Sequence, residues 1–390
     1  RVVRKTTVGD SDAAIADAVR SALGRSGAVI TTGGLGPTAD DVTRPAVAAV
    51  FGRELEFRAD LWEALLQRWK LRGTIPASNR VQAEVPRGGT VFPNPRGTAP
   101  GIAVEDDELG VCILLPGPPH ELKAIVAESV VPYLAERASP DSRRPVRRYV
   151  RTAGIAESAI AERVGNLLDD LSIDVAFLPE IDCNDIRLTA WATDEAKVQG
   201  TLDEAVARLQ TVLGTHVYAL GTKELAEVVG DMLRQQGTTV AVAESCTGGL
   251  VAKRLTDSAG SADYFWGGVI AYADRAKVDL LGVSEETLQR HGAVSEAIAE
   301  EMARGVQRRG GTGAAIAVTG IAGPGGGTDD KPVGTVWLAV ALRDKIVTRK
   351  VHLPGTRDMV RARAAQAAMD LLRRTLLGVA ERDERTLEAQ

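Results

Sequence analysis

The feature that most constrains the fold is a repeated order in which a short apolar run precedes a loop and then a helical segment. The run Ala28-Val29-Ile30 precedes a glycine-rich loop from Thr31 to Asp41, and the run from Val111 to Leu115 precedes Pro116-Gly117-Pro118-Pro119. Repetition of strand, loop and helix is typical of a mostly parallel sheet with helices on both faces. Short continuous apolar runs are typical of buried parallel strands. The sequence therefore predicts an α/β protein.

Helical periodicity agrees with this pattern near the N-terminus. Ile15, Val19 and Leu23 recur every four residues, which places them on one face of a helix. Ser11 can accept a hydrogen bond from a backbone N–H at the start of this helix, and Gly27 can end it.

Changes along the chain predict three domains. Segment 136–148 is polar and contains two prolines, so it marks a boundary. We expect a parallel-sheet domain over 1–140, a small α+β module over 149–220 and a second α/β domain over 222–380. In the module we expect helices at 158–171 and 194–213 and strands at 185–192 and 216–220. In the last domain we expect helices at 223–236, 295–309 and 357–377 and strands at 239–243, 265–272, 314–319, 333–342 and 345–353.

Charge and composition exclude several function classes. The net charge is −5, and no run of Lys and Arg interleaves with aromatic residues. Direct contact with nucleic acid needs a basic surface that neutralises phosphates, so we expect none. Three cysteines without close pairs, Cys112, Cys183 and Cys246, predict neither a disulfide framework nor a zinc site. No apolar stretch is long enough to span a membrane, so we expect a soluble, cytoplasmic protein. The charged tail 381–390 should face solvent.

Ser245 is the strongest candidate for a catalytic residue. It lies just after an apolar run, at the start of a turn that contains Gly248 and Gly249. The hydroxyl and free N–H groups of a helix start would then point to the same place, which suits a developing oxyanion. A serine nucleophile needs a base. Tyr272 and Lys277 follow the next strand, and a lysine removed from water can take the serine proton directly or through a tyrosine hydroxyl.

Each of these residues also has a structural interpretation. Taken alone, Ser245 is more often a helix cap, Lys277 a surface residue and Tyr272 a core residue. Cys246 is a rival nucleophile, but one position further along the turn its side chain should point inward as a small apolar group.

A second glycine-rich loop, from Thr319 to Gly327, follows another apolar run. Its five glycines suit a backbone nest around a phosphate, although no Gly-Lys-Ser/Thr ending marks it as a nucleoside triphosphate loop. Thr319 could place a hydroxyl at the edge of the site. Arg357, Arg361 and Arg363 begin the last helix, where a guanidinium could hold a phosphate. The binding positions expected around the two loops are Gly248, Gly249, Gly320, Gly323, Gly325, Arg357 and Arg361.

Five ordered motifs of the last domain carry a family resemblance. They are AESCTGG at 243–249, GGVIAYADRAKVDLLGV at 267–283, GAVSE at 292–296, VTGIAGPGGG at 318–327 and KPVGTVW at 331–337. They resemble the CinA family, which includes competence/damage-inducible protein CinA and a single-domain nicotinamide-nucleotide amidase, and the resemblance extends over essentially the whole chain. It implies hydrolysis of nicotinamide mononucleotide to nicotinate mononucleotide and ammonia, without a cofactor.

The resemblance also implies which residues act. The active-site residues that it implies are Ser245, Tyr272, Lys277 and Thr319. An arginine of the last helix joins them, with Arg361 favoured and Arg357 second. Thr356 departs from the family, in which Asp is common at this position, so the choice between the arginines stays open.

The implied reaction reads as acyl transfer. Lys277 and Tyr272 deprotonate Ser245, which attacks the carboxamide carbon, and backbone N–H groups near Gly248 hold the oxyanion. Alternatively, Ser245 positions a water molecule that attacks the same carbon.

The loop from Thr32 to Asp41 is the main candidate site of the first domain. Its glycines permit close approach of a ligand to the backbone, and the paired carboxylates of Asp40 and Asp41 can hold Mg²⁺ against phosphate oxygens. Either carboxylate could also cap the next helix. Because strand ends of an open sheet collect ligands, we expect this loop to converge with others on one site.

Further motifs of the first domain extend the resemblance. They are NRVQA at 79–83, NPRGTAPG at 94–101 and LPGPPHE at 115–121. They resemble the N-terminal domain of the CinA family, which is similar to molybdopterin-binding domains. The resemblance implies an ADP-ribose pyrophosphatase that uses a divalent metal, Mg or Co. The site positions expected here are Gly33, Gly34, Gly36, Thr38 and Asn79, with Asp40 and Asp41 as metal ligands. The family usually carries another strand before the position of Arg1, so we expect the domain to lack its first strand, although Arg1 itself reads as part of a strand.

Three functional classes remain open from the sequence. The first is an enzyme for small nucleotide substrates, which explains Ser245 and Lys277 together. The second is a protein that binds molybdopterin or a related pterin, which the N-terminal loops alone suggest. The third is a competence or DNA-repair partner without catalysis. We expect self-association into a homo-oligomer in each case.

Overall fold

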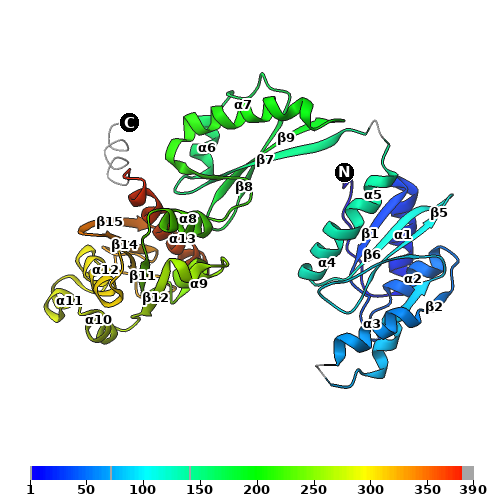
Figure 1. Cartoon of the computed structure of the whole chain (residues 1–390), viewed down its shortest axis with the longest axis horizontal. Coiled ribbons are helices and arrows are strands. Elements are labelled where there is room, and N and C mark those ends of the chain that lie inside the picture. Colours follow the sequence, from blue (N-terminus) through cyan, green and yellow to red (C-terminus); the bar gives the residue numbers. More distant parts are fainter. Residues whose placement is uncertain (1, 71–72, 140–141, 380–390) are drawn as a thin grey trace. The chain divides into compact units, whose positions relative to one another are not determined.

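The computed structural model describes residues 2–70, 73–139 and 142–379. Its contacts divide the chain into two compact units, Arg1–Pro140 and Asp141–Gln390 (Figure 1). Both units contain sheets covered by helices, so the predicted α/β class is confirmed. No helix among the described residues is both long and apolar enough to cross a membrane. The tail predicted at 381–390 lies outside the described residues.

The first unit begins with the helix that the sequence predicts. Ser11 accepts a hydrogen bond from the N–H of Ala14 at 3.3 Å, and Gly27 ends the helix in the left-handed region at φ 64°. Residues 2–9 form no strand, so the strand expected at the start of the chain is absent from the described residues. The elements of this unit are α1 (Asp12–Ser26), β1 (Ala28–Thr32), α2 (Thr43–Val50), β2 (Leu55–Phe57), α3 (Ala59–Trp69), β3 (Glu84–Pro86), β4 (Thr90–Phe92), β5 (Gly101–Asp106), β6 (Gly110–Leu115), α4 (Pro119–Ile125) and α5 (Val131–Arg137).

The main sheet of the first unit is mixed, which corrects the prediction of a mostly parallel sheet. Its strand order is β1-β6-β5-β4, and only β1 and β6 pair in parallel within this sheet. The reason is the short connection 107–109 between β5 and β6, because a parallel pair needs a crossover of a dozen or more residues. The sequence predicts that Ile30 is buried, but it is exposed because β1 is an edge strand of the sheet.

Helices cover both faces of this sheet, as predicted. Val104 and Leu114 face a core shared with α1 and α2, whereas Ile113 and Leu115 face a core shared with α4 and α5. Alternate residues of each strand therefore pack against helices on opposite faces of the sheet.

The second unit contains the middle module and the C-terminal domain. The module consists of β7 (Arg144–Thr152), α6 (Glu157–Val164), β8 (Asp174–Pro179), β9 (Asn184–Ala192), α7 (Ala196–Leu213) and β10 (Val217–Leu220), with strand order β10-β7-β9-β8. The predicted helix 158–171 is too long, because Gly165 ends α6 with a positive φ of 40°. The strand 174–179, which the sequence did not predict, follows the intervening loop.

The C-terminal domain has a five-stranded sheet of order β12-β11-β13-β14-β15, in which β11 is parallel to β12 and β13. Val240 and Val242 face a core shared with α8, α9 and α13, and Ala241 and Ala243 face α12 on the other side (Figure 1). The elements are α8 (Leu225–Gln235), β11 (Val240–Glu244), α9 (Leu250–Thr256), β12 (Phe265–Ile270), α10 (Asp274–Leu281), α11 (Glu285–His291), α12 (Glu296–Gly310), β13 (Ala314–Gly320), β14 (Thr335–Leu342), β15 (Lys345–His352) and α13 (Arg357–Leu376).

A buried ion-pair cluster joins α13 to the middle module. Asp370 accepts hydrogen bonds from Arg373 at 2.8 Å and from Arg374 at 2.7 Å, and all three side chains are buried. Arg373 also donates to the carbonyl of Thr215, and Arg374 lies 3.1 Å from Nδ1 of His216. Burial lowers the pKa of His216, which keeps its ring neutral beside the guanidinium.

We predict that Asp370→Asn lowers the free energy of unfolding by about 3–5 kcal/mol, because it leaves two buried guanidinium groups without their carboxylate. Urea denaturation followed by circular dichroism measures this loss. Asp279→Asn is the control, since Asp279 pairs with Arg275 on the surface and its loss should leave the midpoint nearly unchanged. Equal stability of the two variants would contradict the conclusion that the Asp370 carboxylate stabilises the fold by pairing with the buried arginines.

Candidate active site

Ser245 lies at the carboxyl ends of three parallel strands, β11, β12 and β13. Its N–H donates to the carbonyl of Val318 at 2.9 Å, and the N–H of Ala271 donates to the carbonyl of Glu244 at 2.8 Å. These bonds place Ser245 between the ends of β12 and β13. Its side chain is 7% exposed, and its hydroxyl has no hydrogen-bond partner among the described residues.

The turn after Ser245 is held by the buried carboxylate of Glu244. This side chain is 1% exposed and accepts hydrogen bonds from the N–H groups of Gly249, Val251 and Ala252 at 2.8–3.1 Å. Charged acceptors make the stronger class of hydrogen bond, so the carboxylate of Glu244 occupies the N–H groups at the start of α9 that the sequence predicts as donors to an oxyanion.

Glu244 and the turn itself change the expected oxyanion donors. The N–H of Gly248 donates to the carbonyl of Ser245 at 3.0 Å, so it is not available to an oxyanion in this conformation. The N–H groups of Cys246 and Thr247 have no acceptor among the described backbone and side-chain groups. The Thr247 hydroxyl is also buried without a partner among the described residues. The N–H groups that remain free to donate in this turn are therefore those of the first and second residues after Ser245.

Gly248 and Gly249 are required by backbone geometry and close contact. Both have positive φ, 59° and 96°, where a side chain is strained. A Cβ on Gly249 would also lie 3.1 Å from Ile270, and one on Gly248 would lie 3.4 Å from the guanidinium of Arg361. Gly249 thus lets Ile270 of β12 lie close to the turn. At Gly248 the distance to Arg361 is an ordinary van der Waals contact, so the positive φ is what requires glycine there.

Lys277 is in the first turn of α10 and is 1% exposed, which contradicts its interpretation as a surface residue. Its ammonium donates to the carbonyl of Tyr272 and to the carboxylate of Asp274, each at 3.2 Å. No described contact joins Lys277 or Tyr272 directly to the Ser245 hydroxyl. Asp274 was missed in the sequence, although its position three residues before Lys277 is a recognisable spacing for a helical ion pair.

The two arginines of the last helix approach different parts of the site. Thr356 caps α13 through its hydroxyl, so it provides the helix cap despite the departure from Asp. Arg357 donates to the hydroxyl of Tyr272 at 2.6 Å and to the carbonyl of Gly323 at 2.7 Å. Arg361 donates to the carbonyl of Thr247 at 2.9 Å.

Arg363 points away from these groups. It donates to the carbonyls of Pro354 and Ile181, the latter in the middle module. Arg357 and Arg361 are therefore the arginines that the structure brings to the candidate site.

The second glycine-rich loop contributes unsatisfied N–H groups. The N–H groups of Gly325, Gly326 and Gly327 have no acceptor among the described residues, which fits the predicted nest. Gly320 and Gly323 are needed for packing instead, since a Cβ on them would lie 2.7 Å from Val336 and 2.6 Å from Val333.

Two further candidate catalytic residues, Thr319 and Cys246, are not available for chemistry in this conformation. Thr319 is buried and its hydroxyl donates to the carbonyl of Ala293 at 2.8 Å, so it is not free to act at the edge of the site in this conformation. Cys246 points into the core as predicted, and burial raises the pKa of its thiol to about 12. A thiol with that pKa is a poor nucleophile at neutral pH. All three cysteines are free, as predicted.

The N-terminal loops converge as predicted. The N–H of Gly33 donates to the carbonyl of Leu115 at 2.9 Å, Gln82 donates to Thr98, and Asn94 donates to Glu121. The 3₁₀ helix 77–83 contains Asn79, which is buried and donates to Gln82 at 3.0 Å.

Conformation and contacts explain the glycines of this first loop. Gly33 and Gly34 have positive φ, 96° and 67°, and a Cβ on Gly34 would lie 2.0 Å from Thr43. Gly36 lies against the carboxylate of Asp41. Each of these positions therefore requires glycine for a local reason.

Asp40 and Asp41, the expected metal ligands, are joined by no third metal-binding side chain among the described residues. Asp41 accepts hydrogen bonds from the N–H and hydroxyl of Thr38. Burial alone would raise the pKa of Asp41, but the bonds from Thr38 and Gly36 outweigh it and lower the pKa. No group of three or more His, Cys, Asp or Glu side chains with metal-binding geometry occurs among the residues that the structure describes, and neither Asp40 nor Asp41 caps α2.

Comparison with known families matches three parts of the chain. Residues 222–376 match the CinA C-terminal domain, residues 1–136 match a probable molybdopterin binding domain, and residues 147–219 match the damage-inducible protein CinA KH domain.

Similar proteins cover nearly the whole chain. A CinA-like protein of Gemmatimonas aurantiaca is 48% identical over 377 residues, which cover 96% of this chain and 88% of the relative. A CinA-like protein of Rippkaea orientalis is 40% identical, over 96% of this chain and 90% of the relative. The crystal structure of competence/damage inducible protein CihA from Agrobacterium tumefaciens is 41% identical and covers 39% of this chain and 93% of that chain, with a TM-score of 0.38.

We predict that Glu244→Gln lowers the free energy of unfolding by about 1.5–3 kcal/mol, because an amide replaces a charged acceptor and turns its own NH₂ toward backbone donors. Chemical denaturation measures the change. The control is Glu227→Gln, because that carboxylate accepts one exposed N–H at the start of α8. A Glu244 variant as stable as the control would show that the carboxylate does not hold the turn.

Proposed function

The chain belongs to the CinA family, and from this membership and the site geometry we propose that its C-terminal domain hydrolyses the carboxamide of nicotinamide mononucleotide. The products are nicotinate mononucleotide and ammonia. The observation that carries the proposal is made at the carboxyl ends of β11, β12 and β13. There Ser245 is buried with a hydroxyl that has no hydrogen-bond partner among the described residues, and the N–H groups of Cys246 and Thr247 likewise have no acceptor. The buried Lys277 is held by the carbonyl of Tyr272, which follows β12. An amide hydrolase needs a nucleophile, donors for an oxyanion and a base.

Attack on the amide is the first step. The Ser245 oxygen bonds to the carboxamide carbon while its proton passes to the neutral amine of Lys277, directly or through the Tyr272 hydroxyl. The carbonyl oxygen becomes an oxyanion, and the N–H groups of Cys246 and Thr247 are its nearest free donors along the chain.

Collapse of this intermediate releases ammonia. Lys277 returns the proton to the amide nitrogen, the C–N bond breaks, and an ester to Ser245 remains. Water then attacks the ester, and its proton passes to the same amine. The C–O bond to Ser245 breaks as Lys277 gives that proton to the serine oxygen, which releases the acid and restores the Ser245 hydroxyl and the neutral amine. In the alternative route, Ser245 orients a water that attacks the amide directly and no ester forms.

The phosphate of the substrate has two sources of recognition. The N–H groups of Gly325 to Gly327 offer a nest, and Arg357 and Arg361 offer guanidinium groups near the serine turn. Arg357 also contacts Tyr272, so it links phosphate binding to the proton relay.

For the first unit we propose a site for a phosphate-bearing nucleotide or pterin at the converged N-terminal loops. The contacts between the first loop, Gln82, Asn94 and Leu115 support this proposal. Asp40 and Asp41 as ligands of a divalent metal stay a prediction, and we derive no metal-dependent step. Assays of ADP-ribose hydrolysis with and without added Mg²⁺ or Co²⁺ would separate a pyrophosphatase from a binding protein.

We predict that Lys277→Met reduces ammonia release from nicotinamide mononucleotide by about 10²–10⁴-fold, the usual contribution of a general base. A coupled ammonia assay on the full chain measures this rate, and a denaturation curve verifies folding. Lys253→Met is the matched control, because Lys253 is an exposed lysine that pairs with Asp257. An active Lys277 variant, or a control that loses as much activity, would contradict the proposed role.

A further inference from the structure

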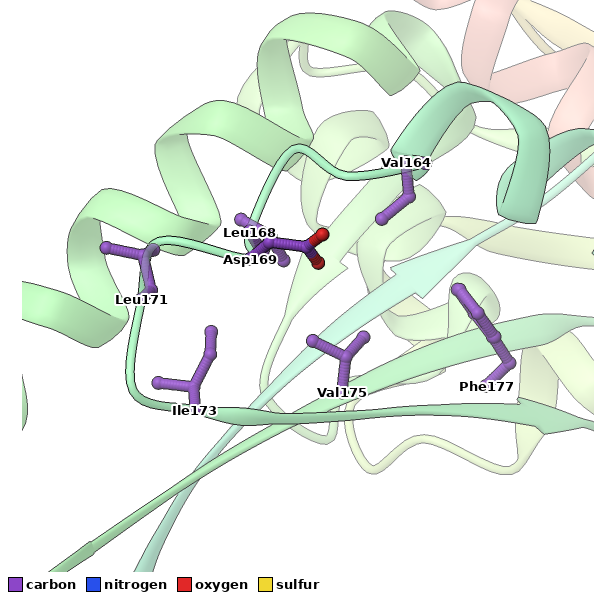
Figure 2. Close-up of a pocket in the computed structure, with 8 residues that line it drawn as sticks. Val164, Leu168, Asp169, Leu171, Ile173, Val175 and Phe177 are labelled. Carbon is purple, nitrogen blue, oxygen red and sulfur yellow. The ribbon is translucent and has the colours of Figure 1, made fainter.

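The middle module contains an apolar pocket that the proposed chemistry does not use. Its volume is about 360 Å³. Val164 and Leu168 line one side, and Val175 and Phe177 of β8 line the other (Figure 2). The remaining lining includes a single charged side chain, Asp169, whose carboxylate points into the space between these apolar groups.

The pocket is held open by a neighbouring ion pair. Arg208 of α7 donates to both carboxylate oxygens of Asp170, at 2.6 and 2.9 Å, and to the carbonyl of Leu167 at 2.9 Å. These bonds anchor the loop 165–173 to the helix. The wall opposite β8 is therefore preformed, which reduces the ordering that a ligand would have to supply.

The carboxylate of Asp169 differs from that of its neighbour. It has no hydrogen bond or ion pair with any residue that the structure describes, whereas Asp170 is paired twice. An unpaired carboxylate beside apolar side chains attracts a cation whose stem is apolar. The same charge repels phosphate, and no Lys or Arg lines the pocket, so the pocket is unsuited to nucleic acid.

The strand that forms one wall has a free edge. β8 is the last strand in the order β10-β7-β9-β8, and within the described chain it pairs with β9 alone. Val175 and Phe177 alternate along β8, Ile173 lies just before its first residue, and all three line the pocket. A free strand edge beside a pocket for alternate side chains is the arrangement that binds extended peptides by strand addition.

We propose that this pocket binds an extended segment of a partner protein, in which an apolar residue is flanked by lysine or arginine. The segment adds to the free edge of β8, its apolar side chain fills the space between Leu168 and Val175, and its cation pairs with Asp169. The proposal is independent of the amidase site, and it gives the middle module a role in recruiting a partner.

The test uses the full chain and two fluorescein-labelled hexapeptides in anisotropy titrations. One has the sequence Lys-Val-Leu-Val-Lys-Thr, and in the other both lysines are glutamates. We expect the lysine peptide to bind about fivefold more tightly, which is the upper range for one exposed ion pair. Asp169→Asn should reduce this preference to less than about twofold, and hydrogen exchange of residues 174–179 should slow when the lysine peptide binds.

Matched variants separate charge from packing. Asp203→Asn removes an exposed carboxylate from α7 of the same module and should leave the preference unchanged. Val175→Thr keeps the shape of the side chain and should weaken both peptides. Equal affinity for the two peptides, no detectable binding of the lysine peptide, or an Asp169 variant that keeps the full preference would overturn the proposal. Displacement of the lysine peptide by an oligouridine would overturn it as well, in favour of RNA.

Discussion

The geometry of the candidate active site depends on one buried carboxylate. Glu244 ends the central strand and accepts three backbone N–H groups at the start of α9, so it fixes where the strand stops and where the helix begins. Ser245 is the next residue, and its position between the ends of β12 and β13 follows from that arrangement. Because the carboxylate occupies the helix start, the N–H groups of this turn that have no acceptor among the described residues are those of Cys246 and Thr247. In the function that we propose, these are the donors that the substrate meets.

The last helix connects this site to the middle module. Arg357 and Arg361 at its beginning contact Tyr272 and the serine turn, and its far end holds the buried cluster around Asp370. A helix anchored by buried ion pairs at one end presents its first turn in a defined position. The middle module therefore contributes to the site by fixing α13, although none of the proposed catalytic residues lies within it.

Much of this arrangement could be predicted from the sequence. The apolar runs located β11 and β13, and the order of motifs brought Ser245, Tyr272 and Lys277 into one hypothesis. Periodicity could not show that Lys277 is buried, because burial there depends on how α10 packs against α12. Nor could it show that the carboxylate of Glu244 binds the N–H groups of the glycine turn, since Glu244 lies just after the predicted strand 239–243. The mixed sheet of the first unit was missed for a similar reason, as strand direction depends on the short connection 107–109 rather than on the apolar pattern.

The most direct test of the account is the rate of ammonia release from nicotinamide mononucleotide by the full chain and by Ser245→Ala, measured at saturating substrate. Both routes through Ser245 predict ammonia from the unaltered chain and a loss of about 10³-fold or more in the variant, as for removal of a nucleophile elsewhere. Full activity of Ser245→Ala, or no ammonia from the unaltered chain, would contradict the central claim that this serine carries amide hydrolysis.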